Sequence, residues 1–184
     1  MDRDGTINNL ADSKKKVTRL RVFSGVARAI KKLNELGFLV VVITNQGGIG
    51  KEVWKKKEVD QVHALLVSDM KKQGAVIDAV YYCPHHPKAT LEKYRLECEC
   101  RKPNIGLILK AIKRFKINPK ESFLVGDMTR DILAGKRAGM KTILVKTGQG
   151  GKEVRYRVKV NPDFVARDIN AAAKIIKQIT SMKA

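Results

Sequence analysis

The sequence predicts an α/β fold, a doubly wound Rossmann-like parallel sheet with helices on both faces. Two observations support this prediction. Short continuous apolar runs rich in β-branched residues suit strands that are buried on both faces, and helical patterns alternate with them along the chain. The 184 residues, of which 43% are hydrophobic and five are proline, are expected to form one domain over residues 1–184.

The elements follow one another in regular order. A helix is predicted over 25–36, where apolar residues recur every three or four positions, and the strand 38–43 reads Phe-Leu-Val-Val-Val-Ile. The helix 57–72 places Val59, Val62 and Leu66 on one face. The same patterns then predict strands over 76–82, 122–125 and 142–145, a short extended piece over 164–166, and helices over 105–115, 132–138 and 168–179.

Composition indicates where the protein works and what it meets. No apolar run approaches the roughly 18 residues that span a bilayer, and no signal-peptide region is evident, so a cytoplasmic protein without membrane insertion is expected. The formal charge of +20 attracts phosphates and nucleic acid without specificity. The lysines are dispersed with little aromatic interleaving, which favours a solvated surface over a nucleic-acid surface. A monomer is expected.

Polar groups follow several predicted strands at their carboxyl ends, where open α/β sheets bind ligands. Four loops are expected to converge there: Asp2-Arg3-Asp4-Gly5-Thr6, Thr44-Asn45-Gln46-Gly47-Gly48, Arg101-Lys102, and Gly126-Asp127 with Asp131. Together they supply several carboxylates, a hydroxyl and cations. Crowded carboxylates repel one another unless a cation is present, and hard oxygen ligands suit magnesium. A magnesium site is therefore predicted.

These groups suit phosphoryl transfer, which needs an in-line nucleophile, cations on the phosphoryl oxygens and a proton donor for the leaving group. A carboxylate can attack phosphorus to form an acyl phosphate, which water then hydrolyses. Asp2 and Asp4, two apart around a turn, can serve as nucleophile and acid/base. Taken alone, the Asp-x-Asp-Gly-Thr pattern also marks ordinary turns, and Asp131 could instead cap the start of a helix.

Sulfur and imidazole ligands are concentrated in one short segment, residues 83–100. Cys83, His85, Cys98 and Cys100 form a Cys-x-His and a Cys-x-Cys pair separated by twelve residues. Four such ligands suit a closed, structural zinc site. Cysteines that pack as small hydrophobes are the alternative, although the charged stretch between the pairs offers little core. Three cysteines are too few for a disulfide framework, and no disulfide is expected.

The order of these motifs resembles the four signature motifs of the haloacid dehalogenase (HAD) superfamily. The matching residues are Asp2-Arg3-Asp4-Gly5-Thr6, Thr44, Lys102, and Gly126-Asp127 with Asp131. The resemblance implies a HAD-like phosphatase without a large cap domain, with Asp2 as nucleophile and Asp4 as general acid/base. It also implies that magnesium is held by Asp2, Asp127 and the Asp4 backbone carbonyl, with Asp131 as a further candidate, and that Thr44 and Lys102 bind the phosphoryl group.

The zinc loop followed by Cys-Arg-Lys-Pro is similar to the heptose bisphosphate phosphatases and histidinol-phosphatases of that superfamily. The stretches 81–87 and 2–8 favour the heptose enzymes, which implies removal of the 7-phosphate of D-glycero-D-manno-heptose 1,7-bisphosphate. Substrate contacts would then fall to Thr44, Asn45, Gln46, Arg101 and Lys102. The heptose enzymes usually carry an acidic residue and Gly-Tyr after the first motif, whereas three lysines occur here at 14–16 and could favour a more highly phosphorylated substrate.

Three alternatives remain open at the level of the sequence. Thr44-Asn45-Gln46-x-Gly48-Ile49-Gly50 and the charge also resemble 3′-phosphatases that act on nucleic-acid ends. Histidinol phosphate is a second candidate substrate, and a zinc-stabilised anion-binding module is the non-enzymatic interpretation. The first acidic motif begins at the second residue, so the apolar strand that should deliver it to the sheet is expected upstream of residue 1.

Overall fold

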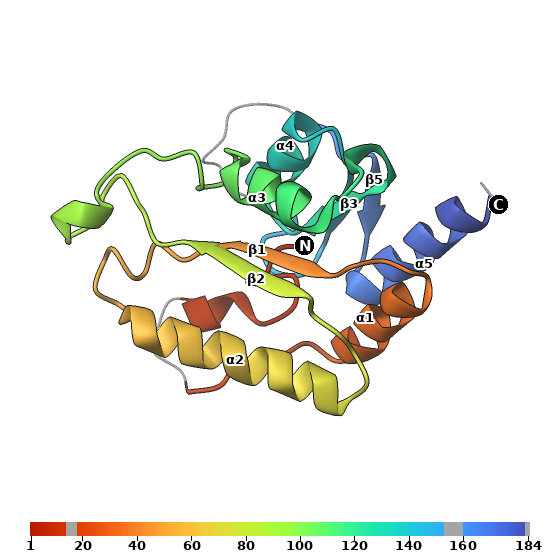
Figure 1. Ribbon diagram of the computed structural model, residues 1–184, viewed down its shortest axis with the longest axis horizontal. Coiled ribbons are helices and arrows are strands. Elements are labelled where there is room, and N and C mark those ends of the chain that lie inside the picture. Colours follow the sequence, from red (N-terminus) through yellow and green to blue (C-terminus); the bar gives the residue numbers. More distant parts are fainter. Residues whose placement is uncertain (14–17, 153–159, 183–184) are drawn as a thin grey trace.

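The computed structural model describes residues 1–13, 18–152 and 160–182 and has the predicted α/β architecture (Figure 1). The strands are β1 (Val41–Asn45), β2 (Ala79–Cys83), β3 (Phe123–Gly126), β4 (Lys141–Val145) and β5 (Phe164–Ala166). The helices are α1 (Val26–Glu35), α2 (Lys56–Lys72), α3 (Gly106–Phe115), α4 (Thr129–Arg137) and α5 (Ile169–Ser181). The predicted order of strands and helices is confirmed, and the differences lie at the ends of elements.

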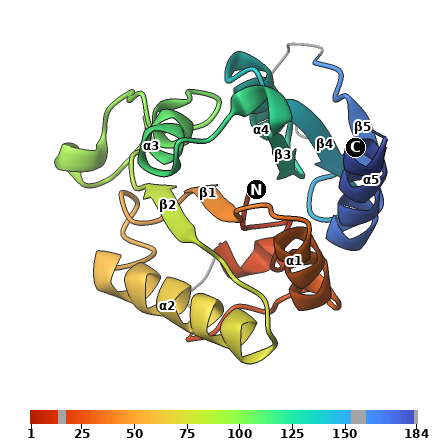
Figure 2. The same ribbon diagram turned by 45° about the vertical axis from the view of Figure 1, so that its right-hand side comes forward.

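Helices pack on both faces of the strands, as continuous apolar runs predict. Val42 of β1 belongs to the core that α1, α2 and α5 cover, whereas its neighbours Val41 and Ile43 belong to the core under α3 and α4. This alternation follows from the period of two along a strand. Figure 2 shows α3 and α4 above β1, and α1 and α2 below it.

The parallel strands form two sheets, β1–β2 and β3–β4–β5, rather than the single sheet of the prediction, whose strand before Asp2 was expected upstream of residue 1. The first two residues lie between them. The Met1 amino group donates to Val41 O at 2.7 Å, and Met1 O accepts from Ile43 N at 2.9 Å. On the other side, Asp2 N donates to Val125 O at 2.8 Å. Met1 is therefore bonded to β1 and Asp2 to β3, so these two residues connect the two sheets. The N-terminus lies between β1 and β3 (Figure 2).

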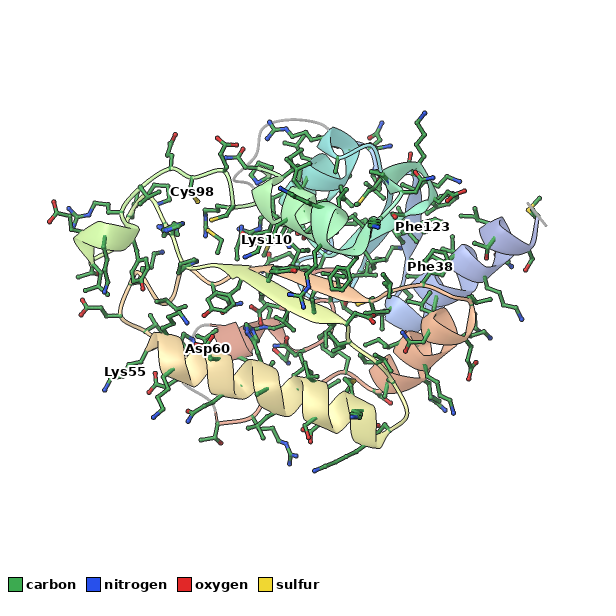
Figure 3. The ribbon with its side chains drawn as sticks, in the orientation of Figure 1. Phe38, Lys55, Asp60, Cys98, Lys110 and Phe123 are labelled. Carbon is green, nitrogen blue, oxygen red and sulfur yellow. The ribbon has the colours of Figure 1, made fainter. Side chains whose placement is uncertain are left out.

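An apolar cavity of about 300 Å³ lies beside Met1 between the two sheets. Val41 and Val125 line it from the two facing strands. At its border the rings of Phe38 and Phe123 meet edge to face at 5.9 Å (Figure 3). Burial, and then the charge of Lys102, lowers the pKa of the Met1 amino group to about 5. The amino group thus lies buried, with apolar side chains and the charges of Lys102, Asp2 and Asp131 around it.

The strands end where the predicted functional loops begin. Asn45 ends β1 and Gly126 ends β3, so the loops that follow lie at neighbouring edges of the two sheets. The segment between β2 and α3 projects from the body at the left of Figure 1. Within the described ranges of the chain, no helix has the length and apolar character needed to cross a membrane.

Candidate active site

A buried lysine lies at the centre of the candidate site. The Lys102 ammonium is 2.8 Å from Asp2 Oδ1 and 2.6 Å from Asp131 Oδ1, and it donates to Ile43 O at 2.6 Å. The residue is 1% exposed. Burial by itself would lower the pKa of Lys102, but the charges of Asp131 and Asp2 raise it above its ordinary value. The ammonium therefore stays protonated and holds both carboxylates.

Three buried carboxylates surround this position. Asp2, Asp127 and Asp131 each place an oxygen within 4.8 Å of the others. Burial would raise the pKa of Asp2, but the neighbouring Lys102 charge holds it below its ordinary value. For Asp127, burial and then the charges of Asp2 and Asp131 raise the pKa to about 8. The positive charges of Lys102 and Arg130 are thus fewer than the three carboxylates.

The donor set fits magnesium. Asp127 Oδ1 is buried and has no hydrogen-bond partner among the described residues. Its other oxygen accepts from Gln149 N at 2.8 Å. An unpartnered carboxylate oxygen close to two more carboxylates is the environment that a hard divalent cation prefers.

Two glycines let the chain pass close to Asp127. A Cβ atom on Gly5 would lie 2.2 Å from Asp127 Oδ2, and one on Gly148 would lie 2.1 Å from the same oxygen. Both glycines also adopt positive φ angles, +84° and +62°, which other residues rarely take. A side chain at either position would displace the carboxylate.

The Asp4 carboxylate is held by three side chains. Arg3 Nη2 donates to its two oxygens at 2.7 and 2.8 Å. Asn8 Nδ2 donates to Oδ1 at 3.0 Å and Gln46 Nε2 donates to Oδ2 at 2.8 Å. The same Gln46 nitrogen lies 3.0 Å from Thr44 Oγ1. Gln46 therefore connects the predicted acid/base to the predicted phosphoryl ligand.

Several predicted residues have protein partners that indicate how they position the site. Asn45 Oδ1 accepts from Lys102 N at 3.0 Å and Asn45 Nδ2 donates to Lys102 O at 3.0 Å, so this amide clamps the Lys102 backbone. Arg101 Nη1 donates to His85 O at 2.9 Å. Asp131 caps the start of α4, because its Oδ2 accepts from Met128 N at 3.1 Å, while its Oδ1 faces Lys102.

Sequence reasoning missed the groups that lie behind Asp4. Asn8 follows the first motif directly, and its position four residues after Asp4 was the available signal. His63 lies 2.6 Å from Arg3 through its Nε2 atom. It occupies the apolar face of α2, four residues after Val59. A polar residue in that apolar stripe was the signal that could have identified it.

The four ligands predicted for zinc come from the end of β2 and the segment that follows it. The Cys83 sulfur lies 3.5 Å from that of Cys98 and 3.0 Å from that of Cys100, and the last two are 3.1 Å apart. His85 Nδ1 is 3.2 Å from the Cys100 sulfur. All four donors lie within 4.8 Å of one another, and Figure 3 shows Cys98 in this projecting segment.

The chemistry of this cluster fits zinc. The three cysteines are free thiols. Burial, followed by the hydrogen bond with Cys100, raises the pKa of the Cys83 thiol above its ordinary range. Thiolates at such short separations require a cation between them, and sulfur and imidazole donors in fourfold array are the set that structural zinc takes.

Comparison with known proteins finds similarity to one family model and to several heptose bisphosphate phosphatases. Residues 99–172 match the family described as HAD-hydrolase-like. A D-glycero-beta-D-manno-heptose-1,7-bisphosphate 7-phosphatase of Pasteurella multocida is 36% identical over 182 residues, which are 98% of this chain and 97% of that protein. A D-glycero-alpha-D-manno-heptose-1,7-bisphosphate 7-phosphatase of Photorhabdus laumondii is 36% identical over 154 residues, covering 83% of this chain and 84% of that protein.

A solved structure extends the likeness to three dimensions. The D,D-heptose 1,7-bisphosphate phosphatase from B. bronchiseptica, complexed with magnesium and phosphate, has a TM-score of 0.81 to this chain. The two are 29% identical, and the match covers 97% of this chain and 96% of that one.

Proposed function

The chain belongs to the HAD-like phosphatases, and from this premise we propose that it removes the 7-phosphate from a D-glycero-D-manno-heptose 1,7-bisphosphate. One observation carries the proposal: the buried Asp2 carboxylate lies 2.8 Å from Lys102 Nζ in a group with Asp127 and Asp131. A carboxylate beside a fixed ammonium and two further acids suits in-line attack on phosphorus. The names of the relatives support the heptose substrate, and both anomers remain candidates.

In the proposed reaction Asp2 attacks the phosphorus opposite the sugar oxygen. The bond from phosphorus to the sugar oxygen breaks as the bond to Asp2 forms, while Thr44 and Lys102 hold the phosphoryl oxygens. Asp4 gives its proton to the departing sugar oxygen. Water then hydrolyses the aspartyl phosphate, with Asp4 accepting the proton, which restores Asp2 and releases inorganic phosphate.

Both metals are part of the proposal. Magnesium would be held by Asp2, Asp127 and the Asp4 backbone carbonyl, with Asp131 as a further candidate, and would neutralise charge on the phosphoryl oxygens. Zinc at the sulfur cluster would have a structural role. Because Cys100 directly precedes Arg101 and Lys102, a fixed cluster also fixes these cations. Thiol ligands and a sugar-phosphate substrate both suit the reducing cytoplasm.

Recognition of the sugar would fall to residues around the phosphoryl site. Arg101, next to Lys102, is the proposed contact to the substrate beyond its reacting phosphate. Gln46 and Asn45 would support it by positioning Thr44 and Lys102. The three lysines at 14–16, expected to favour a more highly phosphorylated substrate, lie outside the described residues.

A phosphate-release assay tests this proposal. The panel contains the α and β anomers of heptose 1,7-bisphosphate, histidinol phosphate and a 3′-phosphorylated oligonucleotide, each with and without magnesium. One heptose anomer should give the highest kcat/KM, by about tenfold or more, and turnover should require magnesium. A higher value for histidinol phosphate or the oligonucleotide would overturn the heptose assignment and leave the phosphatase chemistry in place.

A further inference from the structure

A buried arginine and a buried histidine lie behind the Asp4 carboxylate. The Arg3 side chain is only 2% exposed. Its Nη2 and Nε atoms bind Asp4, Nε at 3.1 Å from Oδ1, while Nη1 lies 2.6 Å from His63 Nε2. The guanidinium therefore connects α2, which carries His63, to the loop that carries the predicted acid/base.

The chemistry of this contact determines the state of the histidine. Arginine has only donors, so the Nε2 atom of His63 must accept and the ring must be neutral, with its proton on Nδ1. Burial, and then the Arg3 charge, lowers the pKa of His63 to about 3, which agrees with a neutral ring. The Asp4 carboxyl group accepts from the guanidinium, and His63 satisfies a donor that would otherwise be buried without a partner.

The imidazole is itself held in place. The Tyr82 ring lies 5.3 Å from it at an angle of 55°. The Tyr82 hydroxyl donates to Asp60 Oδ1 at 2.5 Å, and Asp60 lies on the same helix as His63 (Figure 3). Packing of α2 through Val59 and Leu66 anchors the backbone beneath it. His63 is thus a fixed acceptor.

We propose that His63 is a positioning residue for the reaction: by accepting from Arg3 it fixes the guanidinium, which in turn aims the Asp4 carboxylate at the leaving-group oxygen. This inference rests on the proposed function, in which Asp4 is the acid/base. A free arginine side chain can pair with a carboxylate in several geometries, and a displacement of about 1 Å can cost roughly 10² in rate.

The leaving group distinguishes positioning from general structural support. A sugar alkoxide is strongly basic and needs a proton as it departs, whereas nitrophenolate leaves without one. Misplacement of Asp4 should therefore slow hydrolysis of the sugar phosphate far more than hydrolysis of p-nitrophenyl phosphate. A general loss of structure would lower both rates together.

The test compares His63→Leu with His63→Gln, whose amide oxygen can replace the acceptor. For each variant, kcat/KM is measured with magnesium on the best sugar phosphate of the panel and on p-nitrophenyl phosphate. His63→Leu should lose about 10²-fold on the sugar phosphate and under about threefold on the nitrophenyl ester, whereas His63→Gln should recover most of the sugar-phosphate rate. Equal losses on both substrates, or no recovery with Gln, would overturn the proposal.

A second variant keeps the test valid if His63→Leu folds poorly. Arg3→Lys retains a charge beside Asp4 but cannot also reach His63, so it should show the same selective loss. Asp69→Asn is the matched control, since Asp69 lies on the same helix as His63 but pairs with Arg19 at the surface, and its ratio of the two rates should stay within about twofold of the wild type. A ratio unchanged in Arg3→Lys would contradict the inference. Wild-type protein that hydrolyses neither substrate would overturn the proposed function and the role of His63 with it.

Discussion

The acidic centre around Lys102 and the sulfur cluster around Cys98 are both candidate metal sites, but the chain assembles them in different ways. The sulfur cluster takes all its donors from residues 83–100, a single segment that starts at the last residue of β2 and ends before α3. The acidic centre gathers Asp2, Lys102 and Asp131 from three distant segments that meet where the two sheets approach. A local pattern is enough to predict the first site, whereas the second depends on the topology.

The two sites are also expected to fail in different ways. The two sites are adjacent in the chain, because Cys100 is followed directly by Arg101 and Lys102. The Asn45 amide holds the Lys102 backbone in place. If the acidic centre performs the chemistry and the sulfur cluster positions it, damage to the first should abolish turnover and leave zinc bound. Damage to the second should remove zinc and only weaken turnover.

The largest effect is expected from Asp2→Asn. The amide is a poor nucleophile and a weak metal ligand, so phosphatase activity should fall by about 10⁴-fold or more. Zinc content should remain at about one ion per chain, measured by elemental analysis of the same sample. Full turnover by this variant would contradict the mechanism.

Asp4→Asn should be the next most severe. The leaving group loses its proton donor, an effect of about 10²–10⁴-fold on the sugar phosphate. Asp69→Asn is a matched control, because Asp69 pairs with Arg19 at the surface of α2 and such pairs contribute about 1 kcal/mol or less. Steady-state assays should find the control within about twofold of the wild type. Similar losses in both variants would mean that Asp4 has no special role.

Cys98→Ser tests the other side of the comparison. It should lower zinc content and the melting temperature, and reduce turnover by roughly tenfold through looser placement of Arg101 and Lys102. Its dependence on magnesium should be unchanged, and added zinc should not replace magnesium in the wild type. A metal analysis without zinc, on protein prepared in the absence of chelators, would remove the basis of this prediction.

The smallest effect concerns the apolar cavity beside Met1. We propose that it accepts an apolar strand of about five residues joined to Met1, which would pair with β1 and β3 and replace the buried amino group by a neutral peptide N–H. Such an extension should raise the melting temperature by a few degrees and the turnover severalfold, because Asp2 would be better anchored. An extension of equal length rich in Lys and Pro should do neither. If the two extensions melt alike, the cavity does not bind a strand.

The sequence predicted most of the secondary structure because apolar periodicity is a local property. It placed the start of α4 at Ile132, whereas the helix begins at Thr129, since the Asp131 side chain caps a polar first turn that carries no apolar pattern. It named the four residues whose donor atoms the structure brings together in the sulfur cluster. It did not identify the contact of Arg3 with His63, which are sixty residues apart and meet only after α2 has packed.

The contiguous sulfur cluster has a consequence for the order of events during synthesis. Domains begin to order from the end that leaves the ribosome first, and every donor of this cluster has been translated once Cys100 is added. The acidic centre must wait for Asp127 and Asp131, which come later. If zinc binds at the cluster as proposed, a nascent chain can take it up, and shield three adjacent sulfurs from oxidation, before it is able to attack any phosphate ester.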